Sequence, residues 1–199
     1  MYRLIETIKI SNGIAQNLVW HQKRMDKSFQ YLYNKTNPFY LKDIIKPPTS
    51  FVKDKVKLRF LYNETSYDME YSIYKKKTIK TLKLVFDDNI EYHLKYIDRS
   101  MLNRLTHNRG QYDDILIVKN GLISDSSYTN IVFFDGKNWV TPASPLLFGT
   151  AREKLIYEKA IIPRIIKPHH LKQFKYFRLI NAMLKFEEQD KIEITNIIL

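Results

Sequence analysis

Two turn dipeptides within residues 110–152 constrain the fold of this chain more than any other feature. Asn120-Gly121 and Asp135-Gly136 each separate runs of β-branched and aromatic residues. This combination is the strongest short-range signal for a β-hairpin that a sequence offers. The pattern predicts three strands, at 115–118, 131–134 and 139–140, and then a helix that begins at residue 150.

A cluster of polar residues lies between the first two of these strands. Its members are Ser124, Asp125, Ser126, Ser127, Thr129 and Asn130. A turn between strands can present such residues to a ligand, but the same residue types also bond to backbone groups within turns. Both interpretations stay open on the local sequence alone.

The rest of the chain mixes runs of strands with a few helices, which indicates the α+β fold class. In the first part we expect strands at 4–10 and 14–19, helices at 21–33 and 39–45, and antiparallel strands at 56–62 and 65–74. The second part begins with residues 78–88. In it we expect strands at 161–168, 177–183 and 191–197, and helical segments within 95–110, at 150–160 and at 168–174. We place the boundary between the two parts near residue 79.

Composition excludes several kinds of chemistry. The chain has no cysteine, which removes disulfides, thiolate catalysis and Cys-ligated zinc. It has only five glycines and no glycine-rich phosphate loop. The neighbours His169 and His170 have no third ligand at metal spacing, so no metal site is expected. Glu6 interrupts the apolar residues near the start, and no apolar run is long enough to span a bilayer, so we expect a soluble, cytoplasmic protein.

The charge balance raises nucleic-acid binding as a hypothesis. Lys and Arg number 33 against 21 acids, a formal net charge of +12. The basic residues are scattered, however, and the only dense run is Lys75-Lys76-Lys77. A solvated basic surface is therefore the favoured interpretation, and a nucleic-acid-binding module is a less favoured alternative.

Residues of different types follow one another in a recognisable order. They are His21-Gln22-Lys23-Arg24, Lys95, Gly110, Asp113, Asp114, Asp125, Asn130, Thr141-Pro142 and Leu147-Phe148-Gly149-Thr150-Ala151-Arg152. Taken in this order, the chain resembles the class IV pyridoxal-phosphate aminotransferase family, which includes branched-chain and D-amino-acid aminotransferases and aminodeoxychorismate lyase. It is most similar to the short, lyase-like members. The resemblance implies a two-subdomain α+β fold with mixed sheets and flanking helices, and a homodimer.

The subdomains implied by the resemblance are an N-terminal α/β part over 1–79, shortened at its start, and a C-terminal cofactor-binding part over 80–199. Lys95 matches the lysine that forms a Schiff base with pyridoxal 5′-phosphate and then moves the proton at the reacting carbon. Asp125 aligns with the acid that pairs with the pyridine nitrogen, a position that is normally Glu. A turn cap is the alternative for Asp125.

The resemblance also assigns the residues that hold the cofactor phosphate. Arg24 matches the phosphate-binding arginine, whose planar guanidinium suits phosphate oxygens. The helix at Thr150 and Ala151 matches the one whose first amides hold the same phosphate. The further cofactor residues implied in this way are Asn130, Asn181 and Ala182.

Substrate contacts are expected from the first part of the chain and from the segment before Lys95. Arg59 stands where relatives carry an arginine that can meet a substrate carboxylate. A cross-strand ion pair with an acid of the next strand, Glu64, Asp68 or Glu70, is the open alternative. Tyr2 and Tyr92 are possible pocket residues by position.

The leading hypothesis is an enzyme that uses pyridoxal phosphate on an amino compound carrying a carboxylate, by transamination or by lyase-type elimination. Two positions depart from the family pattern, since Asp125 replaces Glu and Gly149-Thr150-Ala151-Arg152 replaces Gly-Ile-Thr-Arg. A member that keeps the fold without turnover is therefore an alternative hypothesis.

Overall fold

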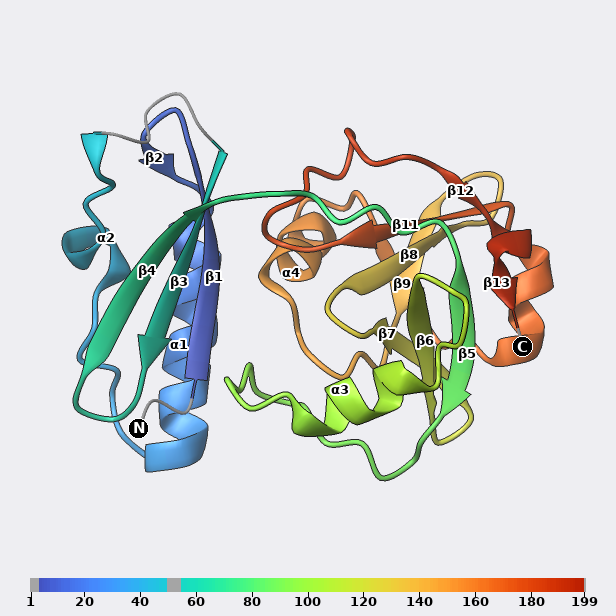
Figure 1. The fold of residues 1–199 in the computed structure, drawn as a ribbon, viewed down its shortest axis with the longest axis horizontal. Helices are drawn as coiled ribbons and strands as arrows, with labels where there is room; N and C mark the ends of the chain where they lie inside the picture. The colour runs from blue at the N-terminus through green and yellow to red at the C-terminus, as the bar shows by residue number, and fades with distance from the viewer. Residues whose placement is uncertain (1–3, 50–54, 199) are drawn as a thin grey trace. The chain divides into compact units, whose positions relative to one another are not determined.

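Strands and helices are mixed along the whole described chain, which comprises residues 4–49 and 55–198 of a computed structural model (Figure 1). The chain divides into two units. Unit 1 is Met1–Lys76 together with Leu94–Asp98, and unit 2 is Lys77–His93 together with Arg99–Leu199. The α+β class predicted from the sequence is confirmed. The predicted folding units, 1–79 and 80–199, stay a prediction.

Unit 1 contains one antiparallel sheet with the strand order β2-β1-β3-β4. Its strands are β1 (Leu4–Ser11), β2 (Ile14–Ala15), β3 (Lys55–Tyr62) and β4 (Tyr67–Ile73). The predicted strand at 14–19 is wrong beyond residue 15, because Asn17 adopts a left-handed conformation and a helix begins at Leu18. The two strands predicted from the alternation around residue 58 are confirmed.

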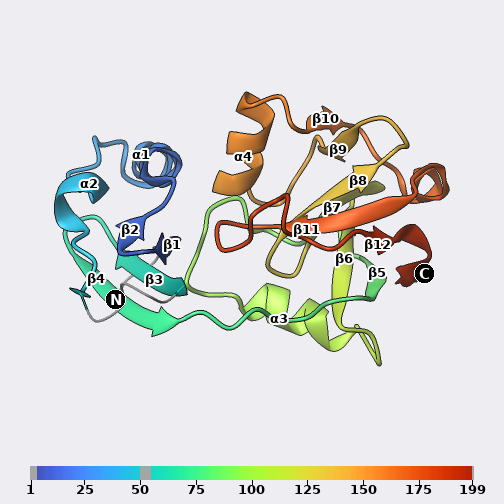
Figure 2. The same ribbon diagram turned by 90° about the horizontal axis from the view of Figure 1, so that it is seen from above.

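Two helices, α1 (Leu18–Tyr33) and α2 (Leu41–Ile44), lie on one face of this sheet (Figure 2). Met25 and Phe29 of α1 are buried in one apolar cluster with inward residues of β1, among them Leu4 and Ile8. Side chains alternate between the faces of a strand, so Glu6 shares the inward side of β1 with these residues. An acid therefore stands at a core position of unit 1.

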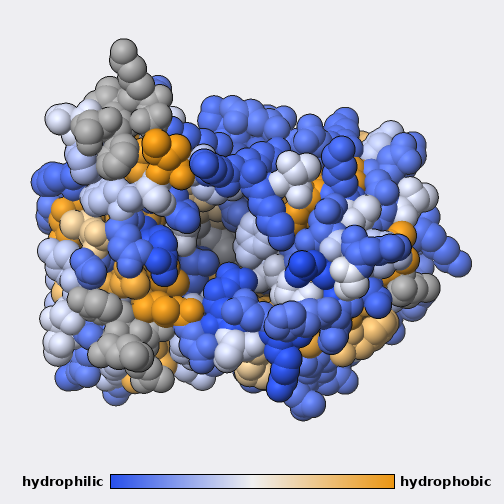
Figure 3. Space-filling view, in the orientation of Figure 1, coloured by the Kyte–Doolittle hydropathy of each residue, from blue (hydrophilic) through white to orange (hydrophobic). Residues whose placement is uncertain are grey.

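Unit 2 contains a four-stranded sheet of order β13-β5-β6-β7 and a five-stranded sheet of order β10-β9-β8-β11-β12. The first holds β5 (Leu82–Phe86), β6 (Asp114–Lys119), β7 (Leu122–Ser126) and β13 (Ile197–Ile198). The second holds β8 (Asn130–Phe134), β9 (Trp139–Pro142), β10 (Ile162–Arg164), β11 (Tyr176–Ile180) and β12 (Ile192–Glu193). Apolar residues of both sheets form one core, and the face of unit 2 visible in Figure 3 is mostly hydrophilic.

The two predicted hairpin turns are present. Asn120 and Gly121 have positive φ angles of 51° and 71° and join β6 to β7, and Gly136 has a φ of 102° in the turn between β8 and β9. The sequence pattern missed β7, because it treated 124–130 as one polar turn. Ser124, Asp125 and Ser126 instead lie in β7, which pairs with β6 in an interrupted register, and all three residues are buried.

The helices of unit 2 are α3 (Ser100–His107) and α4 (Thr150–Tyr157), with short 3₁₀ helices η2 (Pro168–Gln173) and η3 (Ile194–Asn196). Leu155 of α4 packs on Val132 and Ile180 of the five-stranded sheet. Figure 2 shows α3 and α4 on different sides of the sheets. The predicted strand at 191–197 is interrupted by η3. Among the described residues, no helix has the length and apolar character needed to cross a membrane.

Candidate active site

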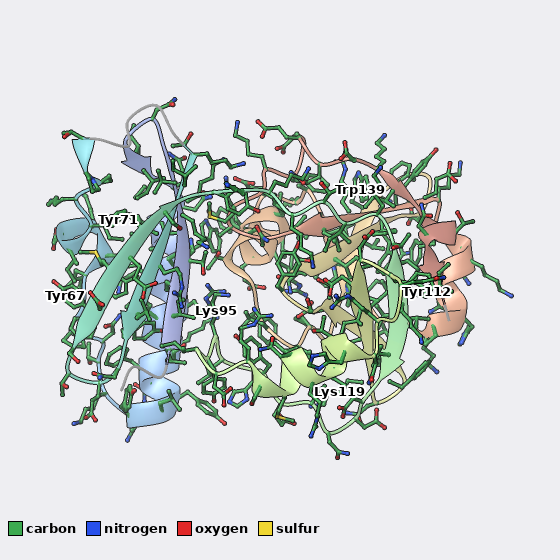
Figure 4. The ribbon with its side chains drawn as sticks, viewed as in Figure 1. Tyr67, Tyr71, Lys95, Tyr112, Lys119 and Trp139 are labelled. Carbon is green, nitrogen blue, oxygen red and sulfur yellow. The ribbon has the colours of Figure 1, made fainter. Side chains whose placement is uncertain are left out.

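The segment that carries Lys95 is tied to β1 of unit 1. The Ile5 amide donates to the Lys95 carbonyl at 3.0 Å, and Tyr96 pairs with Leu4 as an isolated antiparallel bridge. Figure 4 shows Lys95 beside this strand. The Lys95 side chain is half-buried, and its charge is one of the causes that lower the pKa of His21 on α1. Lys95 therefore lies close to the polar residues that β1 and α1 share.

A buried carboxylate, Glu6, joins β1 to α1. His21 Nδ1 lies 2.6 Å from Glu6 Oε2. Arg24 donates to the same carboxylate from Nε to Oε1 at 2.8 Å and from Nη2 to Oε2 at 2.5 Å. The side chains of Glu6 and His21 are both 0% exposed, and that of Arg24 is 13% exposed. Both helix residues reach Glu6 because residues three apart lie on one side of a helix.

Burial and pairing have opposite effects on the charges of this trio. Burial alone would raise the pKa of Glu6, but the Arg24 charge and the hydrogen bonds from His21 and Arg24 outweigh it and hold that pKa at about 2. Burial lowers the pKa of His21, more than its hydrogen bond to Glu6 raises it. At neutral pH a neutral His21 therefore donates from Nδ1 to an ionised Glu6. His21 Nε2 is buried and has no hydrogen-bond partner within the described residues.

Unit 1 thus brings two predicted site residues, Lys95 and Arg24, to one cluster that also contains Glu6 and His21. No role for Glu6 or His21 was predicted from the sequence. Two signals were present, an acid at an inward position of an alternating strand and a histidine one helical turn before a candidate phosphate ligand. Neither signal identifies the partner of the acid, because the pairing depends on how α1 packs on β1.

In unit 2, Asp125 is a buried carboxylate held from two sides. Its side chain accepts a hydrogen bond at Oδ1 from Asn130 Nδ2 at 2.7 Å and at Oδ2 from the Leu147 amide at 3.0 Å. Asp125 is only 4% exposed. Burial raises the pKa of Asp125 to about 6, although the Leu147 and Asn130 hydrogen bonds and the Arg152 charge lower it. The carboxylate is thus largely ionised at neutral pH.

Asn130, the first residue of β8, fixes both Asp125 and the loop before α4. Besides its bond to Asp125, Asn130 Nδ2 donates to the Leu147 carbonyl at 2.9 Å. Gly149 passes close to the same side chain, and a Cβ at that position would lie 2.0 Å from Asn130 Oδ1. The glycine therefore allows the loop to approach Asn130.

Helix α4 begins at Thr150, with Gly149 as its N-cap and no side-chain cap. Thr150 is buried, and Ala151 is partly buried. Arg152 anchors this end of the helix, because its Nη2 donates to the Pro142 carbonyl of β9 at 2.9 Å. The first amides of a helix have no partner within the helix, so they form a suitable site for an anion.

Asn181 and Ala182 follow β11 directly. Ile180, the last residue of β11, is paired with Asn130 in the sheet, so the turn that follows begins beside Asn130. Asn181 Oδ1 accepts from the Met183 amide at 2.9 Å and shapes this turn. Unit 2 therefore places two candidate phosphate residues at the sheet end that also holds Asn130.

The candidate substrate residues are Arg59, Tyr92 and Tyr2. Arg59 of β3 stands opposite Glu70 of β4 and forms an ion pair with it, which is the cross-strand arrangement weighed as the alternative. Tyr92 is buried in unit 2. Tyr2 lies outside the described residues. A substrate role for Arg59 or Tyr92 stays a prediction.

Replacing Gly149 with Ala is expected to destabilise the protein by about 1–3 kcal/mol, the usual cost of overpacking. Asn130 must move away from the new Cβ and lose its hydrogen bonds to Asp125 and to the Leu147 carbonyl. The backbone does not oppose alanine, because Gly149 has a φ of −68° and a ψ of 140°. Urea unfolding followed by tryptophan fluorescence measures the change.

The matched comparison for this prediction is the same substitution in an Asn130→Ala background. The added Cβ then has no amide to displace, so G149A should cost much less there. An equal cost in both backgrounds would show that Asn130 does not determine the requirement for glycine.

The model of the family described as amino-transferase class IV matches residues 3–186 of the chain. A protein of Haemophilus influenzae, named only as uncharacterized, is 41% identical over 185 residues, which are 92% of this chain and 98% of that protein.

Solved structures share the fold. A crystal structure from Haemophilus somnus 129PT, provisionally assigned as a 4-amino-4-deoxychorismate lyase, is 39% identical with a TM-score of 0.87 and covers 92% of this chain and 97% of its own. An aminotransferase from Brucella abortus bound to pyridoxal phosphate is 14% identical with a TM-score of 0.70, over 96% of this chain and 80% of its own, which shows the fold alone. The predicted fold is confirmed.

Proposed function

The chain belongs to the class IV aminotransferase family, and from that membership we propose that it binds pyridoxal 5′-phosphate and acts on an amino acid or another amino-carboxylate. The observation that carries the proposal is the carboxylate of Asp125, which is buried and accepts hydrogen bonds from Asn130 and from the Leu147 amide. A turn cap bonds to amides of its own turn, whereas Leu147 is 22 residues away from Asp125. A carboxylate fixed in this way is suited to hold a proton on a pyridine nitrogen.

The residues of unit 1 fit the aldehyde and phosphate ends of such a cofactor. We propose that Lys95 bonds to the aldehyde carbon and that Arg24 binds the phosphate. A planar guanidinium complements phosphate oxygens, and the buried Glu6 already holds the Arg24 side chain in one orientation. The amine of Lys95 must be neutral to attack the aldehyde, and a neighbouring positive charge favours that neutral form.

The residues of unit 2 fit the phosphate and the ring. The first amides of α4 at Thr150 and Ala151 have no side-chain cap and suit a phosphate, and Ala151 can donate from its backbone although it lacks the usual hydroxyl. We propose that Asn130, Asn181 and Ala182 support this end of the cofactor. Asn130 does so through Asp125, because its amide is bonded to that carboxylate.

The chemistry divides between the cofactor and the chain. Bound pyridoxal phosphate supplies an electron sink for a carbanion. Asp125 keeps the ring nitrogen protonated, which that electron sink requires. Lys95 would accept and return the proton at the reacting carbon of the substrate. The same residues would serve either transamination or aminodeoxychorismate lyase-type elimination.

Adding pyridoxal phosphate to the purified protein should give a yellow species, and borohydride should then fix one pyridoxyl group on Lys95, as read by peptide mass spectrometry. An amino-donor screen that includes aminodeoxychorismate identifies the substrate. A protein that stays colourless and takes up no cofactor would contradict the proposal.

The second candidate is a family member that binds the cofactor without turnover. The departures at Asp125 and Ala151 favour it, because both positions belong to the proposed cofactor site. A yellow protein that converts no donor in the screen would support this candidate. The homodimer and the cytoplasmic location expected from the sequence also stay predictions. Light scattering on the protein as it elutes from a size-exclusion column tests the homodimer.

A further inference from the structure

Glu6, His21 and Arg24 form a buried cluster, here called the Glu6 cluster. Glu6 itself occupies a position of β1 where a strand normally has an apolar side chain. Leu4 and Ile8, the neighbours of Glu6 on the inward side of β1, are both 0% exposed, and so is Glu6. Removing an ionised carboxylate from water is costly even when it is paired, and an apolar residue at such a position is often at least as stabilising. Core packing alone therefore does not explain an acid here.

The geometry of the cluster determines the orientation of Arg24. Glu6 accepts from Nε and from Nη2, so two parallel hydrogen bonds fix the plane of the guanidinium as well as its position. His21 Nδ1 lies 2.6 Å from the same carboxylate and limits its rotation. Both partners of Glu6 come from one turn of α1. A flexible arginine is thereby held in a single arrangement before any ligand binds.

We propose that Glu6 is a positioning residue that holds the Arg24 guanidinium in the orientation needed to bind the cofactor phosphate, with His21 bracing the carboxylate. This inference rests on the proposed function. It goes beyond that function because it assigns a role to two residues that touch neither the cofactor nor the substrate. Preorganisation of this kind strengthens binding by reducing the entropy that ordering a side chain costs.

Glu6 could also have the opposite effect and weaken phosphate binding, so an experiment can distinguish the two. Glu6 is ionised, so it also reduces the positive charge that Arg24 presents to a phosphate. If this neutralisation dominated, removing the carboxylate would strengthen phosphate binding. If positioning dominates, removing it weakens phosphate binding. A purely structural role would change the binding of ligands with and without a phosphate by the same factor.

The experiment compares the affinities of the purified full-length protein for pyridoxal 5′-phosphate and for pyridoxal, measured by absorbance and fluorescence titration without substrate. The affinity for pyridoxal 5′-phosphate divided by the affinity for pyridoxal isolates the contribution of the phosphate to binding. Glu6→Gln should reduce this ratio about 10–100-fold, the size of effect that follows when a residue that orients a metal ligand is removed. In an Arg24→Ala background the same substitution should leave the ratio unchanged, because the arginine to be positioned is absent.

Glu64→Gln is the matched control. It is the same chemical change in the same unit, at an ion pair with Lys35 whose side chains are 40% and 64% exposed, and it should leave the ratio unchanged. Glu6→Asp is the second variant, for use if Glu6→Gln does not fold. Its carboxylate is one methylene shorter and keeps the charge, so it too should lower the ratio.

An unchanged or increased ratio in the folded Glu6 variants overturns the inference, and so does an equal loss in the Arg24→Ala background. If wild-type protein binds pyridoxal phosphate and only these variants fail to behave as expected, the proposed function stands and the inference alone is wrong. If wild-type protein binds neither compound, both are wrong.

Discussion

Replacing Lys95 with Ala is expected to abolish borohydride-stable attachment of pyridoxal phosphate and to lower turnover by about 10²–10⁴-fold, the range supplied by a positioned general acid or base. Lys95 is proposed both to bond to the cofactor and to move the proton at the reacting carbon, so one substitution removes two functions. Peptide mass spectrometry after reduction measures the first effect, and the initial rate with the best donor measures the second.

The control for this substitution is Lys35→Ala. The Lys35 side chain is 64% exposed in a surface ion pair with Glu64, so its loss should change neither attachment nor rate. A labelled peptide that persists in the Lys95→Ala protein would place the covalent bond on another lysine. The family assignment would then stand, and the assignment of this residue would be wrong.

Replacing Asp125 with Asn is expected to lower turnover on the order of 10²-fold, comparable to the loss of one preorganised electrostatic contact. The amide has nearly the same shape as the carboxylate but cannot hold a proton on the ring nitrogen. Asp135→Asn is the matched control, because Asp135 lies in the turn after β8, where an amide oxygen can still accept from Lys137 and Asn138. A rate unchanged by Asp125→Asn would leave Asp125 as a structural residue.

The pH dependence of the wild-type rate follows from the same carboxylate. Burial raises the pKa of Asp125 from 3.8 to about 6, so the group is ionised above that pH and loses its charge as the pH falls through it. A protonated ring nitrogen beside the carboxylate would shift the transition to lower pH. The rate should therefore fall on the acid side with a midpoint at or below about 6, and the Asp125→Asn protein should lack this limb.

Folding stability changes with pH in the opposite sense for Asp125. A raised pKa means that the folded state disfavours the charged carboxylate, so the contribution of Asp125 to stability is greatest below pH 3.8 and declines as the pH rises toward 6. Glu6 behaves in the reverse way. Its pKa is lowered from 4.5 to about 2, so its stabilising contribution is present above 4.5 and is lost as the pH falls toward 2.

Much of the fold could be predicted from local pattern. The alternation around Leu58 predicted β3, the spacing of Met25 and Phe29 predicted α1, and the Asn120-Gly121 dipeptide predicted the turn that follows β6. These features depend on residues within a few positions of one another. The missed strand β7 shows the limit, because a polar strand and a polar turn have the same composition, and only the pairing of this segment with β6 decides between them.

The candidate site shows the same division. The order and spacing of the whole set of motif residues, to which Arg24, Lys95 and Asp125 belong, indicated the family. The partners of these residues were not predictable. Asp125 bonds to an amide 22 residues later, and Arg24 bonds to an acid 18 residues earlier.

The sequence by itself determined the α+β class, the hairpin turns and the family, because short-range periodicity and residue order carry that information. Only the tertiary structure decided that Glu6 and His21 join Arg24 in a buried cluster, and that Asn130 and Gly149 together fix the loop before α4. The physical reason is burial. The charge and the hydrogen-bond partners of a polar side chain are set by the elements that pack around it, and the packing brings together residues that are far apart in the chain.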